Sequence, residues 1–209
     1  MFILGLTGSI GMGKTVAAGD FRRLGIPVHD SDATVHALMA KGGAAVSPVS
    51  QAFSGVLKDG AIDRRALGRR VFGDDAALKR LEAILHPMVR QQSHKFLGIH
   101  ARRRTPAVVL DIPLLFESGG ERRCDAVAVV SAPYREQRRR VLSRPGMTEE
   151  RFQEILKHQI PDDLKRRAAD FVIFTGLGRA HSLLMIRQIA KIICSSEGRH
   201  WPPQKRSRG

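Results

Sequence analysis

Aromatic residues and cysteines are scarce in this chain, and each scarcity argues against a class of protein. With only 1 Trp and 1 Tyr, the chain lacks the aromatic platforms on which single-stranded nucleic acids stack. The two cysteines, Cys124 and Cys194, show no metal-ligand spacing and are expected to be reduced thiols. No stretch of about 18 apolar residues occurs, so no membrane-spanning helix is predicted. An apolar run rather than a basic segment begins the chain, unlike a signal peptide, and a cytoplasmic protein is expected.

Basic residues, by contrast, are abundant. The formal net charge is +15, with 35 Lys and Arg against 20 Asp and Glu. This charge favours polyanionic partners such as nucleotides, nucleic acid or an anionic membrane surface. Most of the basic clusters, which lie at Arg102–Arg104, Arg138–Arg140 and Lys165–Arg167, are interpreted as solvated helix faces. Residues 197–209 are basic and broken by prolines, which predicts a disordered tail.

Residues 8–15 read Gly-Ser-Ile-Gly-Met-Gly-Lys-Thr and match G-x-x-x-x-G-K-[ST], the phosphate-binding P-loop. The apolar run Phe2–Leu6 precedes them and a helix-like segment follows, which is the context that the motif requires. Glycines let backbone N–H groups approach phosphates. Lys14 can span the β- and γ-phosphates, and the Thr15 hydroxyl can hold Mg²⁺. The chain is therefore predicted to bind a nucleoside triphosphate, and the alternative is a glycine-rich turn beside a surface lysine.

Short apolar runs alternate with helical patterns along most of the chain, which predicts an α/β protein with a parallel sheet covered on both faces. The five predicted strands are Phe2–Leu6, Ile26–His29, Val108–Leu110, Ala126–Val130 and Phe171–Phe174. A final amphipathic helix is expected over Ala180–Ile193. We predict a three-layer α/β/α core formed by residues 1–33 and 105–196.

Residues 34–104 depart from this alternation of strands and helices, because they contain no convincing strand and several helical patterns. Helices are expected over Arg64–Phe72, over Ala76–Leu85 and from Met88 to about Arg103. His86-Pro87 separates the last two, since proline disfavours helix at the residue before it. We interpret the segment as a helical insertion into the core.

Asp30-Ser31-Asp32 follows the second predicted strand. Ligands of open α/β sheets gather at the carboxyl ends of the strands, so Asp32 is expected beside the P-loop. Its carboxylate could accept a substrate hydroxyl proton and hold that oxygen in line with the γ-phosphate. The structural alternative is that Asp32 caps the helix predicted from Ala33. No Asn-Lys-x-Asp segment, typical of guanine-binding P-loop proteins, is present.

Gln137, Arg140 and Arg144 are spaced to share one face of a helix. Arg140 and Arg144 could clamp a triphosphate and neutralise charge on the transferred group, although arginines on helix surfaces are common. Residues 144–168 are expected to form a lid that excludes water from the reaction. The predicted ATP-binding residues are Gly8, Gly11, Met12, Gly13, Lys14, Thr15, Val16 and Arg144.

The chain resembles the dephospho-coenzyme A kinase family over roughly residues 3–175. The matching segments keep the family's order: Leu6-Thr7-Gly8, Asp30 and Asp32, Asp63-Arg64 with Leu67, His86-Pro87, Pro113-Leu114-Leu115-Phe116-Glu117, Gln137 with Arg140 and Arg144, Gln159, and Ala169-Asp170.

This resemblance implies a P-loop kinase core and transfer of the ATP γ-phosphoryl group to the ribose 3′-hydroxyl of dephospho-coenzyme A. It implies that Asp32 is the base or hydroxyl-orienting acid, Lys14 the phosphate bridge and Arg140 the stabiliser of transferred charge. The insertion would hold the pantetheine-bearing substrate, with Arg64 and His86 as further substrate-side residues. For His86, packing of a helix-breaking pair is an equal alternative.

Several positions depart from the family's usual pattern. Ser9, Met12 and Thr15 differ from it inside the P-loop, where Thr15 is chemically equivalent to the usual Ser. Phe174-Thr175-Gly176 stands where an Asp-Asn-like segment is usual, in a loop expected to border the adenine. Asp111 resembles a second acidic residue that could bind magnesium, and we rank it below Asp32 as a candidate site residue.

Two alternative functions remain. One is a P-loop kinase for another nucleoside or nucleotide, and the other is a nucleotide-dependent nucleic-acid-binding protein, prompted by the +15 charge. ATP, Mg²⁺ and dephospho-coenzyme A are the expected ligands. No membrane or nucleic-acid partner is expected.

Overall fold

The computed structural model describes residues 1–71 and 73–202. The chain divides into two compact units. The first comprises Met1–His29 and the chain from Ile99 onward, and the second comprises Asp30–Gly98.

A five-stranded parallel sheet forms the centre of the first unit, as the sequence predicts. The strands are β1 (Phe2–Thr7), β2 (Val28–Asp30), β5 (Ala107–Asp111), β6 (Ala126–Ser131) and β7 (Phe171–Phe174). Their order across the sheet is β2-β5-β1-β6-β7. The central strand β1 pairs Leu6 with Asp111 of β5 and with Ala128 of β6, so the carboxyl ends of these strands share one edge.

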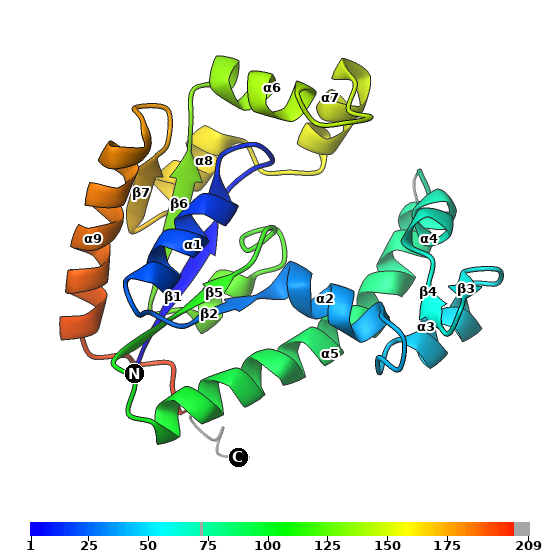
Figure 1. The fold of residues 1–209 in the computed structure, drawn as a ribbon, viewed down its shortest axis with the longest axis horizontal. Coiled ribbons are helices and arrows are strands. Elements are labelled where there is room, and N and C mark those ends of the chain that lie inside the picture. Colours follow the sequence, from blue (N-terminus) through cyan, green and yellow to red (C-terminus); the bar gives the residue numbers. More distant parts are fainter. Residues whose placement is uncertain (72, 203–209) are drawn as a thin grey trace, which may run out of the picture. The chain divides into compact units, whose positions relative to one another are not determined.

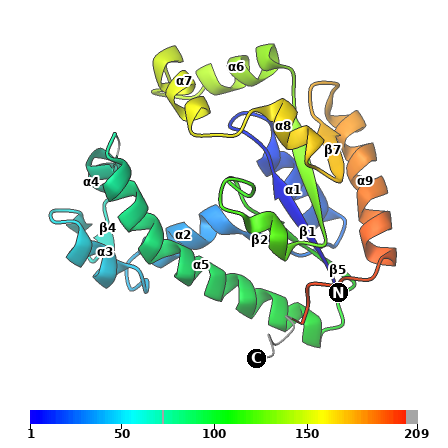
Figure 2. The same ribbon diagram turned by 180° about the vertical axis from the view of Figure 1, so that it is seen from behind.

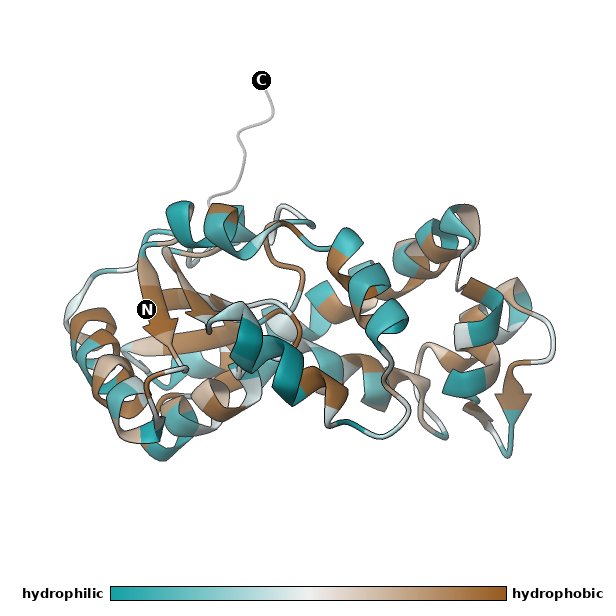
Figure 3. Ribbon diagram, turned by 90° about the horizontal axis from the view of Figure 1, so that it is seen from above, coloured by the Kyte–Doolittle hydropathy of each residue, from teal (hydrophilic) through white to brown (hydrophobic). Residues whose placement is uncertain are grey.

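The strands form because their residues are apolar on both sides of the sheet. Every residue of β1, β5 and β6 is buried. Figure 3 shows the strands hydrophobic along their length, whereas the helices alternate between hydrophobic and hydrophilic turns. Continuous apolar runs of this kind are typical of parallel strands that are covered by helices on both faces.

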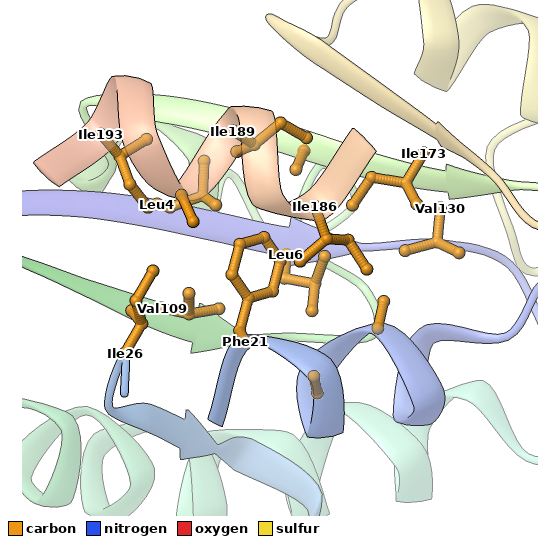
Figure 4. Packing of buried hydrophobic residues seen from close by; sticks show 14 of the residues in the cluster. Leu4, Leu6, Phe21, Ile26, Val109, Val130, Ile173, Ile186, Ile189 and Ile193 are labelled. Carbon is orange, nitrogen blue, oxygen red and sulfur yellow. The ribbon is translucent and has the colours of Figure 1, made fainter. Parts of the chain in front are cut away.

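Helices α1 (Lys14–Arg23) and α9 (Arg179–Ser195) pack together and cover one face of the sheet (Figure 1). Figure 4 shows Phe21 of α1 and Ile186, Ile189 and Ile193 of α9 directed toward Leu4 and Leu6 of β1. All six side chains belong to one buried cluster. Burying a large apolar side chain contributes about 1.5–3 kcal/mol, so this cluster holds the sheet and the two helices together.

The other face of the sheet carries α8 (Asp162–Arg167), which packs against β6 and is visible from behind in Figure 2. Helices α6 (Tyr134–Leu142) and α7 (Glu149–Lys157) precede it and contact each other. A short 3₁₀ helix, Gly120–Arg123, leads into β6. Cys124 and Cys194 are free thiols as predicted, and burial raises the pKa of the Cys124 thiol to about 12.

The second unit is mainly helical, as predicted for residues 34–104. Its helices are α2 (Ser31–Met39), α3 (Val46–Ala52), α4 (Arg64–Val71) and the greater part of α5 (Asp75–Arg102). It has its own buried apolar cluster, which includes Val49, Phe53 and Leu81. A small antiparallel hairpin, β3 (Leu57–Lys58) with β4 (Ala61–Ile62), was not predicted.

The predicted helix break at His86-Pro87 is wrong, because α5 continues through Pro87 without interruption. Proline removes one backbone hydrogen bond and clashes with the preceding turn. On the N-terminal side Leu81 and Leu85 are buried in the cluster of the second unit, and beyond the proline Met88 packs against that cluster. This apolar stripe, at helical spacing, outweighs the local cost of the proline.

The beginning of the predicted disordered tail, 197–209, is ordered where the structure describes it. The backbone N–H groups of Arg199 and His200 donate to Asp125 Oδ1, at 2.5 and 3.1 Å. The same carboxylate accepts a hydrogen bond from Ile3 N–H, at 2.7 Å. Residues 203–209 lie outside the described residues. Across the described part of the chain, no helix combines the length and apolar character needed to cross a membrane.

Candidate active site

The P-loop connects β1 to the first turn of α1, and close packing requires its glycines. A Cβ atom on Gly8 would lie 2.6 Å from the carbonyl oxygen of Val130 in β6. Gly11 and Gly13 have φ angles of +78° and +95°, a left-handed conformation that other residues rarely adopt. These glycines therefore fix the loop against the sheet in addition to opening its backbone to phosphates.

Lys14 of the P-loop is paired with the acid that ends β5. Its Nζ lies 2.5 Å from Asp111 Oδ1, and the two side chains are 15% and 3% exposed. The strand register explains the contact, because Asp111 is paired with Leu6, two residues before the P-loop begins at Gly8. A carboxylate this deeply buried needs a charged partner. Asp111, which the sequence ranked below Asp32, is thus in direct contact with the P-loop lysine.

Two glutamines hold the backbone of Ile10 inside the P-loop. Gln137 Nε2 donates to the Ile10 carbonyl oxygen at 2.8 Å, and the Ile10 N–H donates to Gln159 Oε1 at 3.1 Å. The N–H and the carbonyl group of Ile10, which belong to consecutive peptide units, are therefore both satisfied by side chains from α6 and from the segment after α7. These contacts leave the conformation of the loop well defined before any ligand binds.

Arg140 reaches the P-loop through Thr175. Its Nη1 donates to Thr175 Oγ1 at 2.9 Å and its Nη2 donates to the Thr175 carbonyl oxygen at 2.8 Å. The Thr175 hydroxyl in turn donates to the Met12 carbonyl oxygen at 2.7 Å. Arg140 Nη1 also lies 3.5 Å from the Gly11 carbonyl oxygen. Gln137 and Arg140, predicted to share a helix face, both contact the P-loop.

Among the remaining predicted ATP-binding residues, Thr15, Val16 and Arg144 are exposed. Thr15 and Val16 lie in the first turn of α1, where the Val16 N–H donates to the Gly13 carbonyl oxygen at 3.1 Å. Arg144 is exposed and lies two residues after the end of α6, so the prediction that it shares a helix face with Gln137 and Arg140 is wrong. Met12, by contrast, is buried, and its Sδ accepts a hydrogen bond from the Ala132 N–H at 3.1 Å.

Asp32 belongs to the second unit and does not cap a helix. Helix α2 begins at Ser31, and its cap is Asp30, whose Oδ1 accepts a hydrogen bond from Ala33 N–H at 2.9 Å. Asp32 is exposed in the first turn. Among the described residues, no hydrogen bond or ion pair engages its carboxylate. The capping alternative for Asp32 is therefore wrong.

Arg64 and His86 are also exposed in the second unit. Arg64 begins α4, which Asp63 caps by accepting hydrogen bonds from the N–H groups of Arg65 and Ala66 at 2.9 and 3.2 Å. These two backbone hydrogen bonds lower the pKa of the Asp63 carboxyl. His86 lies within the continuous helix α5, so its interpretation as part of a packed helix break is wrong.

A buried ion pair that the sequence did not predict ties α8 to the loop after β5. Lys165 Nζ lies 2.7 Å from Glu117 Oε1, with side chains 0% and 16% exposed. Glu117 Oε1 also accepts a hydrogen bond from Ile160 N–H at 3.0 Å. The interpretation of Lys165–Arg167 as a solvated face is wrong for Lys165. In the sequence, the Pro113–Glu117 motif was the one signal for this ion pair, because the motif ends in the glutamate that forms it.

Comparison with known proteins agrees with this geometry. The family model described as dephospho-CoA kinase matches residues 2–177. A dephospho-CoA kinase of Paramagnetospirillum magneticum is 66% identical over 166 residues, which cover 79% of this chain and 78% of that protein. A dephospho-CoA kinase of Rhodospirillum rubrum is 53% identical over 208 residues, which cover 98% of this chain and 97% of that protein. The crystal structure of TT1252 from Thermus thermophilus superposes with a TM-score of 0.79 at 36% identity, covering 94% of this chain and 98% of that one.

Proposed function

Because the chain belongs to the dephospho-CoA kinase family, we propose that it transfers the γ-phosphoryl group of ATP to the ribose 3′-hydroxyl of dephospho-CoA, the last step of coenzyme A synthesis. The observation that carries this proposal is the fixed P-loop, whose lysine and neighbouring Arg140 bring two cations to one phosphate-binding loop. Catalysis of phosphoryl transfer consists mainly of such positioning and charge stabilisation.

Lys14 bridges the β- and γ-phosphates in this proposal, and Arg140 stabilises the charge that develops on the transferred group. The contacts of Arg140 with Thr175 support this role, because they hold the guanidinium beside the P-loop before the nucleotide arrives. Arg144 begins the lid, residues 144–168, and contacts the triphosphate when the lid closes. The phosphates are bound by the backbone and side chains of Gly8, Gly11, Met12, Gly13, Lys14, Thr15 and Val16.

Magnesium fits the oxygen donors present. Mg²⁺ prefers one or two protein oxygens together with water and substrate phosphates. Thr15 offers a hydroxyl in the first turn of α1, and Asp111 offers a carboxylate beside Lys14. Among the described residues no group of three or more His, Cys, Asp or Glu side chains could hold a metal, which agrees with a site completed by ATP itself. When bound, the ion neutralises charge on the β- and γ-phosphates.

Asp32 is the acid that we propose to accept the proton of the 3′-hydroxyl, or to orient that hydroxyl toward the γ-phosphate. Its support is that it follows β2, a strand of the same parallel sheet, and that Asp30 already performs the capping role. Arg64 and His86 are proposed substrate-binding residues, and residues 34–104 the acceptor-binding part of the chain. ATP is supplied in the cytoplasm, which is the compartment that we propose.

An acceptor panel tests the assignment. The protein is incubated with Mg-ATP and, separately, with dephospho-CoA, with nucleosides and with nucleoside monophosphates, and the products are resolved by mass spectrometry. Phosphorylation of dephospho-CoA in preference to the other acceptors is expected. Preference for a nucleoside or nucleotide would replace this proposal with the neighbouring kinase class.

A further inference from the structure

The connection between α7 and α8, residues 158–161, holds the P-loop through the side chain of Gln159. Gln159 Oε1 accepts a hydrogen bond from the Ile10 N–H at 3.1 Å. Gln159 lies two residues after the end of α7, outside any helix or strand. Connecting segments are more mobile than helices and strands unless their backbone is held. What holds residues 158–161 therefore determines how firmly the P-loop is fixed at Ile10.

Glu117 holds the backbone of this connection from outside it. The N–H groups of His158 and Gln159 donate to carbonyl oxygens in the last turn of α7, and Pro161 has no N–H to donate. The Ile160 N–H donates instead to Glu117 Oε1 at 3.0 Å. This hydrogen bond joins residues that are 43 positions apart in the sequence. Gln159 is therefore held on one side by the end of α7 and on the other by Glu117.

The segment that carries Glu117 is itself fixed to β1, the strand that leads into the P-loop. Thr7 Oγ1, at the end of β1, donates to the Pro113 carbonyl oxygen at 2.9 Å. Leu115 is fully buried, and a Cβ atom on Gly5 of β1 would lie 2.8 Å from its Cδ2. The strand and this segment are thus in close contact, which gives Glu117 a rigid support.

Lys165 keeps the Glu117 carboxylate at this position. The Lys165 side chain is 0% exposed, and its Nζ lies 2.7 Å from Glu117 Oε1, the same oxygen that accepts from the Ile160 N–H. A buried ion pair contributes little net stability compared with apolar residues of similar volume, because desolvation offsets the attraction. It does restrict the carboxylate to one place, since neither buried charge can leave its partner without a large penalty. The pair therefore fixes the geometry at Ile160 more than it stabilises the fold.

We propose that Glu117 is a positioning residue for ATP binding: through the Ile160 N–H it fixes Gln159, and through Gln159 it fixes the P-loop in the conformation that receives the phosphates. The proposal rests on the proposed function, in which this loop binds the triphosphate of ATP, and adds to it. Glu117 acts through Gln159 and makes no contact of its own with the nucleotide. Lys165 acts in turn through Glu117.

Two substitutions of Glu117 are compared in the background Lys165→Met, so that no buried charge is left unpaired. Glu117→Gln keeps an oxygen that can accept from the Ile160 N–H, whereas Glu117→Leu keeps none. Each variant leaves one polar group without a partner, either the new amide NH₂ or the Ile160 N–H, so their free energies of unfolding in urea should be similar. We expect the Glu117→Leu variant to bind Mg-ATP about five- to tenfold more weakly than the Glu117→Gln variant in isothermal titration calorimetry, the range for the loss of one hydrogen bond.

The same comparison with Gln159→Leu added distinguishes positioning from a general loss of structure. Gln159→Leu deletes the acceptor of the Ile10 N–H, and with it the connection between Glu117 and the P-loop. The affinities of the Glu117→Gln and Glu117→Leu variants should then differ by less than about twofold, because the effects of residues that act through one another are not additive. Equal affinities of the two variants when Gln159 is present, or a difference that persists undiminished in Gln159→Leu, would overturn the inference.

Hydrogen exchange of the unsubstituted protein, followed by NMR, tests the coupling without requiring any variant to fold. Mg-ATP should slow exchange of the Ile160 N–H as well as the Ile10 N–H, because coupling between two sites is reciprocal. The Cys124 N–H, which donates to the Glu121 carbonyl oxygen between β5 and β6, is the matched control and should not change. Exchange of the Ile160 N–H that is unaffected by Mg-ATP would overturn the inference. Binding of ATP without phosphorylation of dephospho-CoA would instead overturn the proposed function, and the measured affinities would still decide the role of Glu117.

Discussion

The hydroxyl of Thr175 connects Arg140 to the P-loop, and its removal is the most informative single perturbation. Thr175→Val keeps the shape of the side chain but deletes the donor to the Met12 carbonyl oxygen and one acceptor of Arg140, contacts of 2.7 and 2.9 Å. Met12 is buried, so its carbonyl oxygen loses a partner that water does not readily replace. Leaving such an oxygen unsatisfied costs about 1–3 kcal/mol. Arg140 Nη2 retains the Thr175 carbonyl oxygen at 2.8 Å, whereas Nη1 keeps only the Gly11 carbonyl oxygen at 3.5 Å. We therefore assign most of the loss of stability to Met12 and the loss of orientation to the guanidinium.

We therefore expect the free energy of unfolding, measured by urea denaturation, to fall by about 1–3 kcal/mol in Thr175→Val. The kcat should fall about tenfold with a smaller change in KM for ATP, because the guanidinium loses part of its fixed orientation. Thr175→Ser retains the hydroxyl and should stay close to the unsubstituted protein in both measurements. The reasoning is refuted if Thr175→Val keeps the original stability and kcat, or if Thr175→Ser is equally impaired.

Three further substitutions test other parts of the structure. Asp32→Asn should lower kcat by about two to four orders of magnitude with ATP affinity retained, and unchanged turnover would remove Asp32 from the mechanism. Pro87→Ala should raise the urea-measured free energy of unfolding by about 1–3 kcal/mol, because it removes a proline from inside α5, and a decrease would contradict this account. Burial opposes the charge of the Asp125 carboxyl, but its hydrogen bonds, led by the one from Arg199 N–H, outweigh burial and lower its pKa. The stability that this carboxylate contributes is therefore present above pH about 4 and is lost as the pH falls further. Asp125→Asn should thus cost about 1–3 kcal/mol at pH 7 and progressively less below pH 4 in thermal denaturation, and a pH-independent loss would refute the assignment.

The sheet and the P-loop could be predicted because local sequence determines them. The runs that became β1 and β6 are apolar at every position, and Gly8–Thr15 is a contiguous motif. The β3–β4 hairpin escaped prediction because each strand has two residues, too few for an alternating pattern. The prediction of a helix break at Pro87 was wrong for the opposite reason. The local preference of proline against helix was outweighed by packing along α5.

Contacts between residues distant in sequence account for what was missed in the site. A lysine in a basic run is ordinarily solvated, and only the fold shows that Lys165 is paired with Glu117. Likewise, the pairing of Lys14 with Asp111 depends on the register between β1 and β5, which no local pattern specifies. The capping role of Asp30 also had to be seen in the structure, because Asp30 and Asp32 are equally plausible caps by residue type.

Coupled stoichiometry tests the central claim, phosphoryl transfer to dephospho-CoA, most directly. ADP and coenzyme A are quantified together by liquid chromatography after incubation of the protein with Mg-ATP and dephospho-CoA. We predict one coenzyme A for each ADP, with the new phosphate on the ribose 3′-oxygen. ADP released without coenzyme A, or a phosphate on any other oxygen, would contradict the account.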